Sequence, residues 1–250
     1  MSEKDNSSFL YKKAIKDYLT EFIMLFAAVT LGFFAENLRE GYAERKLELQ
    51  LMKSMVADLE RNEELLLSQK ASLNSRRVAC DSLSYFFNQK DLKLYGAELY
   101  MYGRRLGYYA GEYPLSSRSL DQLKNSGLFS IISQDVVADS LSNYDNLKTE
   151  YEQRIKWYFE DVKKVQDINK LIFDTRVFEK ATVYTDEFTF KILRPEGNPS
   201  LMTYDPGELQ NYYNTFYYLR RNTETQLRNV ADLIESTTDL KKLIIQEYKF

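Results

Sequence analysis

Residues 22–35 read FIMLFAAVTLGFFA, fourteen residues in a row without a charged or amide side chain. Glu21 precedes this run and Glu36 follows it. At about 1.5 Å per residue the run covers roughly 21 Å of helix, which is less than the hydrocarbon thickness of about 30 Å. Extending it to residues 18–38 gives about 31 Å, with both carboxylates near the ends, where a charge costs least. The sequence therefore predicts a transmembrane helix over 18–38, bounded by Glu21 and Glu36.

Two other interpretations compete with a transmembrane helix over this run. In the first, the protein is a soluble helical protein with residues 22–35 buried in its core, because apolar runs of this length are also typical of buried helices. The run is apolar on all sides and not striped, which favours lipid over the side of a small bundle. In the second, the run is a secretory signal, but no small-residue cleavage site follows it and the helical pattern continues through Arg39.

The charges around the run bear on the membrane topology. Lys12, Lys13 and Lys16 directly precede the span and are placed to reach phosphate headgroups. Lysine and arginine residues within a similar distance of the span are equal in number on its two sides. Any preference for one membrane orientation therefore comes only from these three lysines. They favour an N-terminal tail (1–17) inside and a large domain (39–250) on the non-cytoplasmic side. Glu21 is either a solvated boundary residue or a group that faces a partner helix within the membrane.

Composition excludes several functional classes. The 250 residues contain no histidine, which removes the usual general base, the usual zinc ligand and every Ser-His or Cys-His nucleophile pair. The single cysteine, Cys80, excludes an internal disulfide framework. The net charge of −3 comes without a basic stripe, so nucleic acid is not an expected partner. We predict no enzyme activity, no cofactor and no metal site.

The breaker residues are few and clustered, with nine glycines and four prolines. Long segments without a breaker predict helices over 43–88, 134–179 and 206–247, each roughly 65 Å long. Equal lengths predict an all-α fold in which the transmembrane helix continues into an elongated, up-down-up antiparallel bundle with short capping helices. Alternation in TVYTDEFTFKIL, which includes Phe188, followed by a proline-rich turn predicts a hairpin or irregular insert near 181–205.

A seven-residue repeat marks the first of these helices. Met52, Leu59, Leu66 and Leu73 recur at this spacing, with Leu49 and Val56 between them. Such a repeat predicts a seam for another helix. Glu63 and Lys70 occupy positions that a strict coiled coil fills with apolar residues. The seam is therefore interpreted as one face of an intramolecular bundle.

Two segments resemble a family of uncharacterised bacterial single-pass membrane proteins. The first is YLTEFIMLFAAVTLGFFAENLREGYAERKLELQLMKSMVADLERN, with a glutamate near the start of the span and a leucine-rich run from Leu51 to Asn62. The second is SLDQLKNSGLFSIISQDVVADSLSNYDNL. It is similar to a segment of that family in which a helix is followed by a glycine and then by an apolar stretch. The resemblance covers about a third of the chain and implies a bacterial inner (cytoplasmic) membrane protein, with no activity attached.

The leading hypothesis is thus a non-catalytic, membrane-anchored interaction, sensor or scaffold protein. Its expected partners are the lipid bilayer and a second copy of itself or another membrane protein. The alternative is a ligand-binding helical bundle with a pocket among Tyr100, Tyr102, Tyr108 and Tyr109. An enzyme that uses carboxylates and lysine is the weakest of the three hypotheses, because nothing in the sequence marks such a site.

Overall fold

The fold is all-α, as predicted. The computed structural model describes residues 3–108, 114–185 and 190–250, with side chains from residue 18 onward. Within these ranges the elements are helices apart from one two-stranded antiparallel sheet. The chain divides into two compact units, residues 1–53 and residues 54–250. This division falls fifteen residues after the predicted domain boundary at 38/39, and the bounds 1–17, 18–38 and 39–250 stay predictions.

Helix α1 (Glu3–Phe87) is 85 residues long and contributes to both units. The first unit consists of α1 up to Lys53, together with the chain start. Every described side chain from 18 to 46 in this unit is exposed. The second unit contains the remainder of α1 and all other elements.

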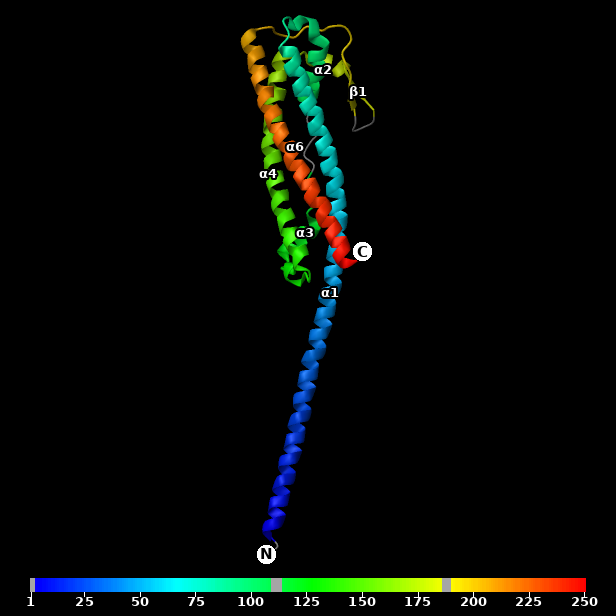
Figure 1. Ribbon diagram of the computed structural model, residues 1–250, viewed down its shortest axis with the longest axis vertical. Helices are drawn as coiled ribbons and strands as arrows, with labels where there is room; N and C mark the ends of the chain where they lie inside the picture. The colour runs from blue at the N-terminus through cyan, green and yellow to red at the C-terminus, as the bar shows by residue number, and fades with distance from the viewer. Residues whose placement is uncertain (1–2, 109–113, 186–189) are drawn as a thin grey trace. The chain divides into compact units, whose positions relative to one another are not determined.

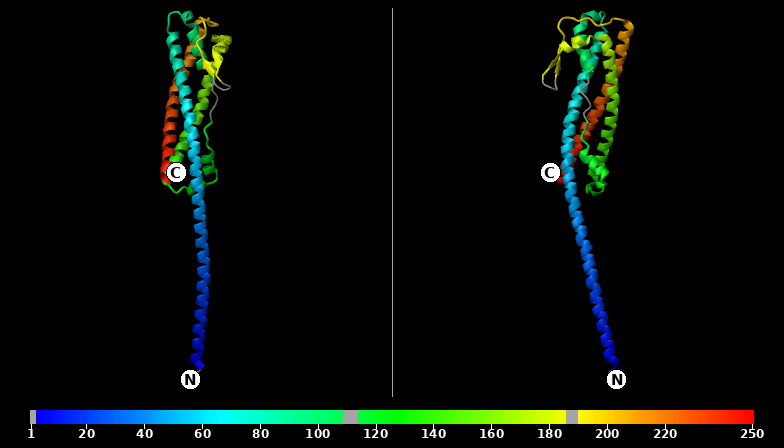
Figure 2. Two further views of the ribbon diagram at one scale, coloured as in Figure 1. Left: turned by 90° about the vertical axis from the view of Figure 1, so that its right-hand side faces the viewer. Right: turned by 180° about the vertical axis from the view of Figure 1, so that it is seen from behind.

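Three long helices lie side by side in the second unit: α1 from residue 54 onward, α4 (Asp135–Ile172) and α6 (Pro206–Tyr248) (Figures 1 and 2). Asn62 of α1 donates a hydrogen bond to the Tyr144 hydroxyl at 2.9 Å, and Arg76 donates to the Tyr158 hydroxyl at 2.8 Å. Both pairs are 82 positions apart. A constant offset means that α1 and α4 run in the same direction.

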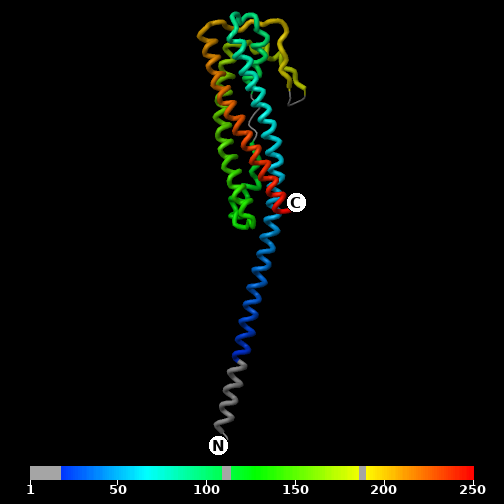
Figure 3. The backbone as a smooth tube through the Cα atoms, viewed as in Figure 1, coloured from blue at the N-terminus to red at the C-terminus, as the bar shows by residue number. Residues whose placement is uncertain are grey.

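Helix α6 runs the opposite way. Glu63 of α1 pairs with Lys241, whereas Asp81, farther along α1, pairs with Arg220, nearer the start of α6. The tube in Figure 3 follows α4 in green and α6 from orange to red, back along it. The order is therefore up-up-down, and the predicted up-down-up arrangement is wrong.

The physical reason is the chain between α1 and α4. Arg76 donates to the Tyr108 carbonyl, whereas Asn62 bonds to Ser116. Tyr108 and Ser116 therefore lie beside positions of α1 that are fourteen residues, or about 21 Å, apart, with Ser116 nearer residue 54. The chain after Ser116 therefore begins α4 at the same end of the bundle as residue 54. Equal helix lengths alone did not indicate this.

The short elements are divided between the two ends of the bundle. The 3₁₀ turn η1 (Leu92–Tyr95) and α2 (Gly96–Leu106) follow α1 at one end, where Phe86 packs on Tyr102. At the other end, α3 (Arg118–Asn125) and η2 (Leu128–Ile131) precede α4. Gly127 between them has a φ of 70°, the left-handed conformation expected of a helix-terminating glycine.

Helix α4 ends at Ile172, seven residues before the predicted end. Asp174 accepts a hydrogen bond from the Arg176 backbone N–H at 2.9 Å and so caps a separate helix, α5 (Thr175–Lys180). The predicted insert then forms a hairpin of β1 (Thr182–Tyr184) and β2 (Phe190–Ile192), with Val183 opposite Lys191. Phe188 lies outside the described residues. Asp205 caps α6 through the Glu208 N–H at 2.9 Å, with Pro206 in its first turn, at the start of the helix predicted over 206–247.

Candidate membrane segment and polar layers of the bundle

Helix α1 is long and apolar enough near its N-terminus to cross a membrane. Its apolar side chains between 18 and 38 are exposed on all sides, with Leu25 at 69% and Phe33 at 70% exposure. In water, exposed apolar surface of this extent is unfavourable and marks an interaction site. No side chain of the segment is buried, so the interpretation that places residues 22–35 in a soluble core finds no support here.

The two carboxylates that bound the apolar run are both exposed. Glu36 accepts a hydrogen bond from Arg39 Nε at 3.0 Å, one helical turn later. The pair is exposed to solvent, so its main effect is to give both charges a partner at the end of the run. The side chains of Lys12, Lys13 and Lys16, which were predicted to reach headgroups, lie outside those that the structure describes.

In the second unit, the buried positions of α1 follow steps of three and four residues. Leu59, Leu66 and Leu73 are buried, as the seven-residue repeat predicts. The positions between them are polar: Asn62, Gln69 and Arg76 are 1%, 6% and 4% exposed, respectively. Val56, which was predicted to share the seam, is only half-buried. The alternating seam positions of α1 are thus a buried polar series, not an apolar one.

These polar side chains form layers across the three helices. At one level, Tyr144 of α4 receives a hydrogen bond from Asn62 and also bonds to Thr237 of α6. Burial raises the pKa of Tyr144 to about 12. Two heptads farther along, Arg76 donates to Tyr158, whose hydroxyl lies 3.0 Å from Thr223 Oγ1. Each layer joins all three helices through side-chain hydrogen bonds.

A third layer lies midway between these two. It consists of Gln69 on α1, Tyr151 on α4 and Val230 on α6. Each of these residues is seven positions in sequence from the corresponding residue of either neighbouring layer. The position that is Thr223 or Thr237 in the other layers is here a valine. The three polar layers are flanked by apolar ones in the same register, which are Met55, Val137 and Ile244 on one side and Leu83, Val165 and Phe216 on the other.

The first polar layer also holds the start of α3. Asn62 Oδ1 accepts from the Ser116 N–H at 2.6 Å, and Asp58 accepts from the Ser119 N–H at 2.9 Å. Ser117, at the N-cap of α3, makes no capping hydrogen bond of its own, so Asp58 of α1 supplies this cap. Burial alone would raise the pKa of Asp58, but hydrogen bonds from Ser116 and Ser119 outweigh it and lower the pKa below 3.8.

The tyrosines that were predicted to line a pocket separate into different contacts. The hydroxyl of Tyr100 donates to the Ser200 carbonyl at 3.0 Å and accepts from the Asp174 N–H at 2.9 Å. Tyr102 packs on Phe86, and Tyr108 packs edge-on against Phe190. Tyr109 lies outside the described residues. Tyr100, Tyr102 and Tyr108 each take part in ring packing, and a ligand site among these tyrosines stays a prediction.

Reactive or metal-binding groups do not gather in the described part of the chain. No three or more of its cysteine, aspartate and glutamate side chains lie together in a way that suits a metal ion. The thiol of Cys80 is fully buried, and burial raises its pKa to about 12, which leaves it protonated and unreactive at neutral pH.

Sequence reasoning missed the polar layers, although a signal for them exists. Asn62, Gln69 and Arg76 recur every seven residues, as do Tyr144, Tyr151 and Tyr158. Among the polar positions of the seam, only Glu63 and Lys70 were considered, and this series was not. Matching the two series at one offset of 82 would have paired each of them and also revealed the parallel direction of α1 and α4.

Comparison with known proteins adds no relative. The resemblance to uncharacterised bacterial single-pass membrane proteins, taken from the two sequence segments, stays a prediction. No protein-family model, curated protein or solved structure matches this chain.

Proposed function

We propose that the protein is a non-catalytic, membrane-anchored helical interaction or sensor module, with a scaffold role, of the bacterial cytoplasmic membrane. The observation that carries this proposal is the exposed apolar segment 18–38 within the same helix, α1, that supplies Asn62, Gln69 and Arg76 to the buried layers. Lipid is the environment in which such a segment is stable, because about 20 apolar residues span the hydrocarbon core.

The polar layers suit a signalling role for α1. Buried polar groups are costly unless they are paired, so a heptad with polar seam positions tolerates few alternative registers. A displacement of α1 by one position would break the hydrogen bonds of Asn62 and Arg76 together. We infer that the bundle responds to a force on α1 by switching between discrete arrangements. The partners in this proposal are the bilayer and a second copy or another membrane protein, with Glu21 available to face a partner helix.

Extraction of membranes with alkaline carbonate tests the anchor. The wild-type protein is expected to stay in the membrane pellet. The double variant Phe26→Lys, Leu31→Lys puts two charges near the middle of the run, where each costs about 3 kcal/mol, and is expected in the supernatant. The matched control Leu67→Lys, Tyr85→Lys changes two exposed residues of the same helix outside the run and should remain in the pellet. Release of the wild-type protein by carbonate would contradict the proposal.

A further inference from the structure

One side of α1 in the second unit is both exposed and uncharged. Every exposed residue of α1 between 65 and 87 lacks a charge, and these residues, here named the outer stripe, are Leu67, Ser68, Ala71, Ser75, Val78 and Tyr85. The charged residues of the same stretch are all buried or half-buried, and these are Lys70, Arg76, Arg77 and Asp81. Leu67 is 52% and Tyr85 62% exposed. Exposed apolar side chains that gather on one face mark an interaction site.

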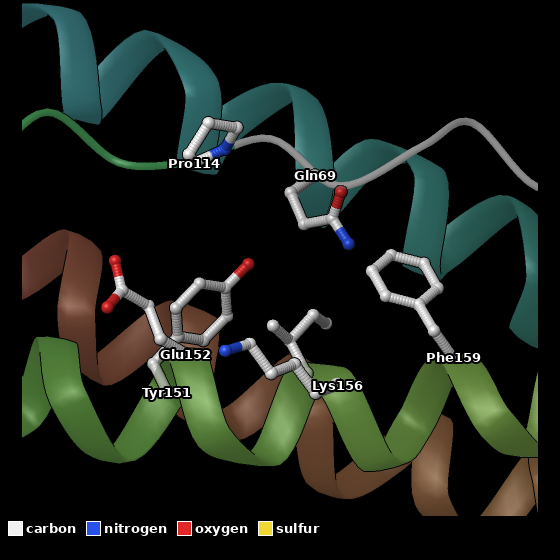
Figure 4. Close-up of a pocket in the computed structure, with 7 residues that line it drawn as sticks. Gln69, Pro114, Tyr151, Glu152, Lys156 and Phe159 are labelled. Carbon is white, nitrogen blue, oxygen red and sulfur yellow. The ribbon is translucent and has the colours of Figure 1, made fainter.

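The outer stripe lies on the side of α1 that α4 and α6 leave free. Figure 4 shows Gln69 directed from α1 toward Tyr151 and Phe159 of α4. Glu63 and Asp81 form the ion pairs of α1 with α6. In the left view of Figure 2, α1 runs along the front of the second unit, with α4 and α6 behind it. The remaining side of α1 is therefore open to another molecule.

The spacing of the outer stripe suits a helix as the partner. Ser68, Ala71, Ser75 and Val78 follow steps of three, four and three residues, and Tyr85 stands seven residues after Val78. Such steps place side chains along one line of a helix, in the pattern that packs against a second helix. The small side chains of Ser68, Ala71 and Ser75 permit a close approach, because the distance between helix axes depends on the residues at the contact.

The missing charges identify the partner as a second copy of this chain. In a parallel contact in register, each residue meets its own copy, so a charged residue at the centre would face a like charge at considerable cost. The outer stripe avoids this cost. The outer sides of the other long helices do not, since their exposed residues include Lys156, Glu160, Lys163, Lys164 and Asp167 on α4, and Arg221, Arg228, Asp232, Glu235 and Asp239 on α6.

We propose that the outer stripe binds the outer stripe of a second copy, with the two α1 helices parallel and in register about a two-fold axis. The axes approach most closely at Ala71 and Ser75 and separate toward Tyr85, whose larger rings fill the wider space. The contact covers residues 67–85, about 28 Å of helix. This inference rests on the proposed membrane anchor, which gives all copies the same direction and raises their effective concentration.

Cysteine cross-linking in membranes that contain the full-length protein tests the register. Ser75→Cys should form a disulfide-linked dimer under oxygen with a copper catalyst, because a disulfide needs two Cα atoms within about 7 Å. Lys163→Cys, on the outer side of α4, is the matched control and should stay monomeric. The native Cys80 is buried and protonated and does not compete. Equal cross-linking of the two variants, or none at Ser75→Cys, would overturn the proposal.

Energy transfer in dilute proteoliposomes measures the association itself. Full-length Lys90→Cys protein, labelled with donor or acceptor dyes, should show transfer between copies. Adding Val78→Lys places two ammonium groups against each other and should lower the association constant at least about tenfold. Val136→Lys is the matched control, because Val136 on α4 is 50% exposed and Val78 is 48% exposed. Equal transfer in these two variants would place the contact elsewhere and refute the assignment.

The dimer and the membrane anchor fail separately. The double variant Leu67→Lys, Tyr85→Lys should stay in the carbonate pellet, as stated above, and yet lose energy transfer. A wild-type protein that remains in the pellet but shows no transfer would refute the dimer and leave the anchor in place. A wild-type protein that carbonate releases would refute the anchor, on which the dimer rests.

Discussion

Val230 occupies the position that threonine holds in the layers on either side. The hydroxyls of Thr223 and Thr237 donate to the carbonyls of Leu219 and Leu233, four residues earlier, at 2.7 and 2.6 Å. A threonine at 230 can do the same and also bond to Tyr151. We therefore expect Val230→Thr to change the free energy of unfolding by less than about 1 kcal/mol.

Val165→Thr is the matched control for this change, because Val165 is equally buried but belongs to an apolar layer. Its new hydroxyl would meet no side-chain partner in that layer and should cost about 1–3 kcal/mol. Urea unfolding followed by circular dichroism measures both variants. Equal losses at the two positions would show that the layer register is not as described.

Asp58 gives a residue-level pH dependence. Its pKa in the folded protein is below 3.8, so its contribution to stability is complete above pH 3.8 and is lost as the pH falls below that value. Asp58→Asn should therefore be less stable than the wild type by about 1–2 kcal/mol at pH 6, because α3 loses a charged cap. The difference should shrink as the pH falls toward 2.5. A difference that stays constant with pH would mean that the Asp58 charge does not hold α3.

At the scale of the elements, Gly96 shows how closely α2 packs on the segment before α6. A Cβ at this position would lie 2.0 Å from the Pro199 carbonyl oxygen, a backbone atom that cannot turn aside. Gly96→Ala should cost about 2–3 kcal/mol through overpacking. Gly41, also helical, has no atom within 4 Å of such a Cβ, so Gly41→Ala should leave the unfolding of the bundle unchanged. Thermal unfolding of the pair measures the contrast, and similar midpoints would argue against this packing.

Element positions were largely readable from the sequence, whereas their directions and partners were not. The long segment without a breaker after the proline-rich turn located α6, and alternation located the hairpin. The end of α4 was placed too late because no glycine or proline marks it, and Asp174 ends it by capping α5 instead. The polar layers were missed because their burial depends on α1 and α4 being parallel, a fact of tertiary structure.

At the scale of the whole molecule, a labelling test decides on which side of the membrane the proposed anchor places the second unit. Cys80 is buried and protonated, so the wild type should not react with an impermeant maleimide even after lysis. Lys90→Cys places a thiol on an exposed turn. We expect this variant to be labelled in intact spheroplasts, with the large domain on the non-cytoplasmic side. Labelling only after lysis would reverse the orientation.

The up-up-down order of α1, α4 and α6 has a consequence for biosynthesis. The ribosome releases α1 first, yet the last turns of its partner α6 are the ones that pair with Glu63. Residues of α1 that contact α4, such as Asn62 and Arg76, can find Tyr144 and Tyr158 earlier, but the side of α1 that faces α6 must wait until almost the whole polypeptide has been made. Helices α4 and α6, joined by a shorter stretch, are free to associate earlier as a hairpin that later receives α1. Chains that terminate before Pro206 should consequently be substrates for chaperones and proteases instead of smaller folded proteins.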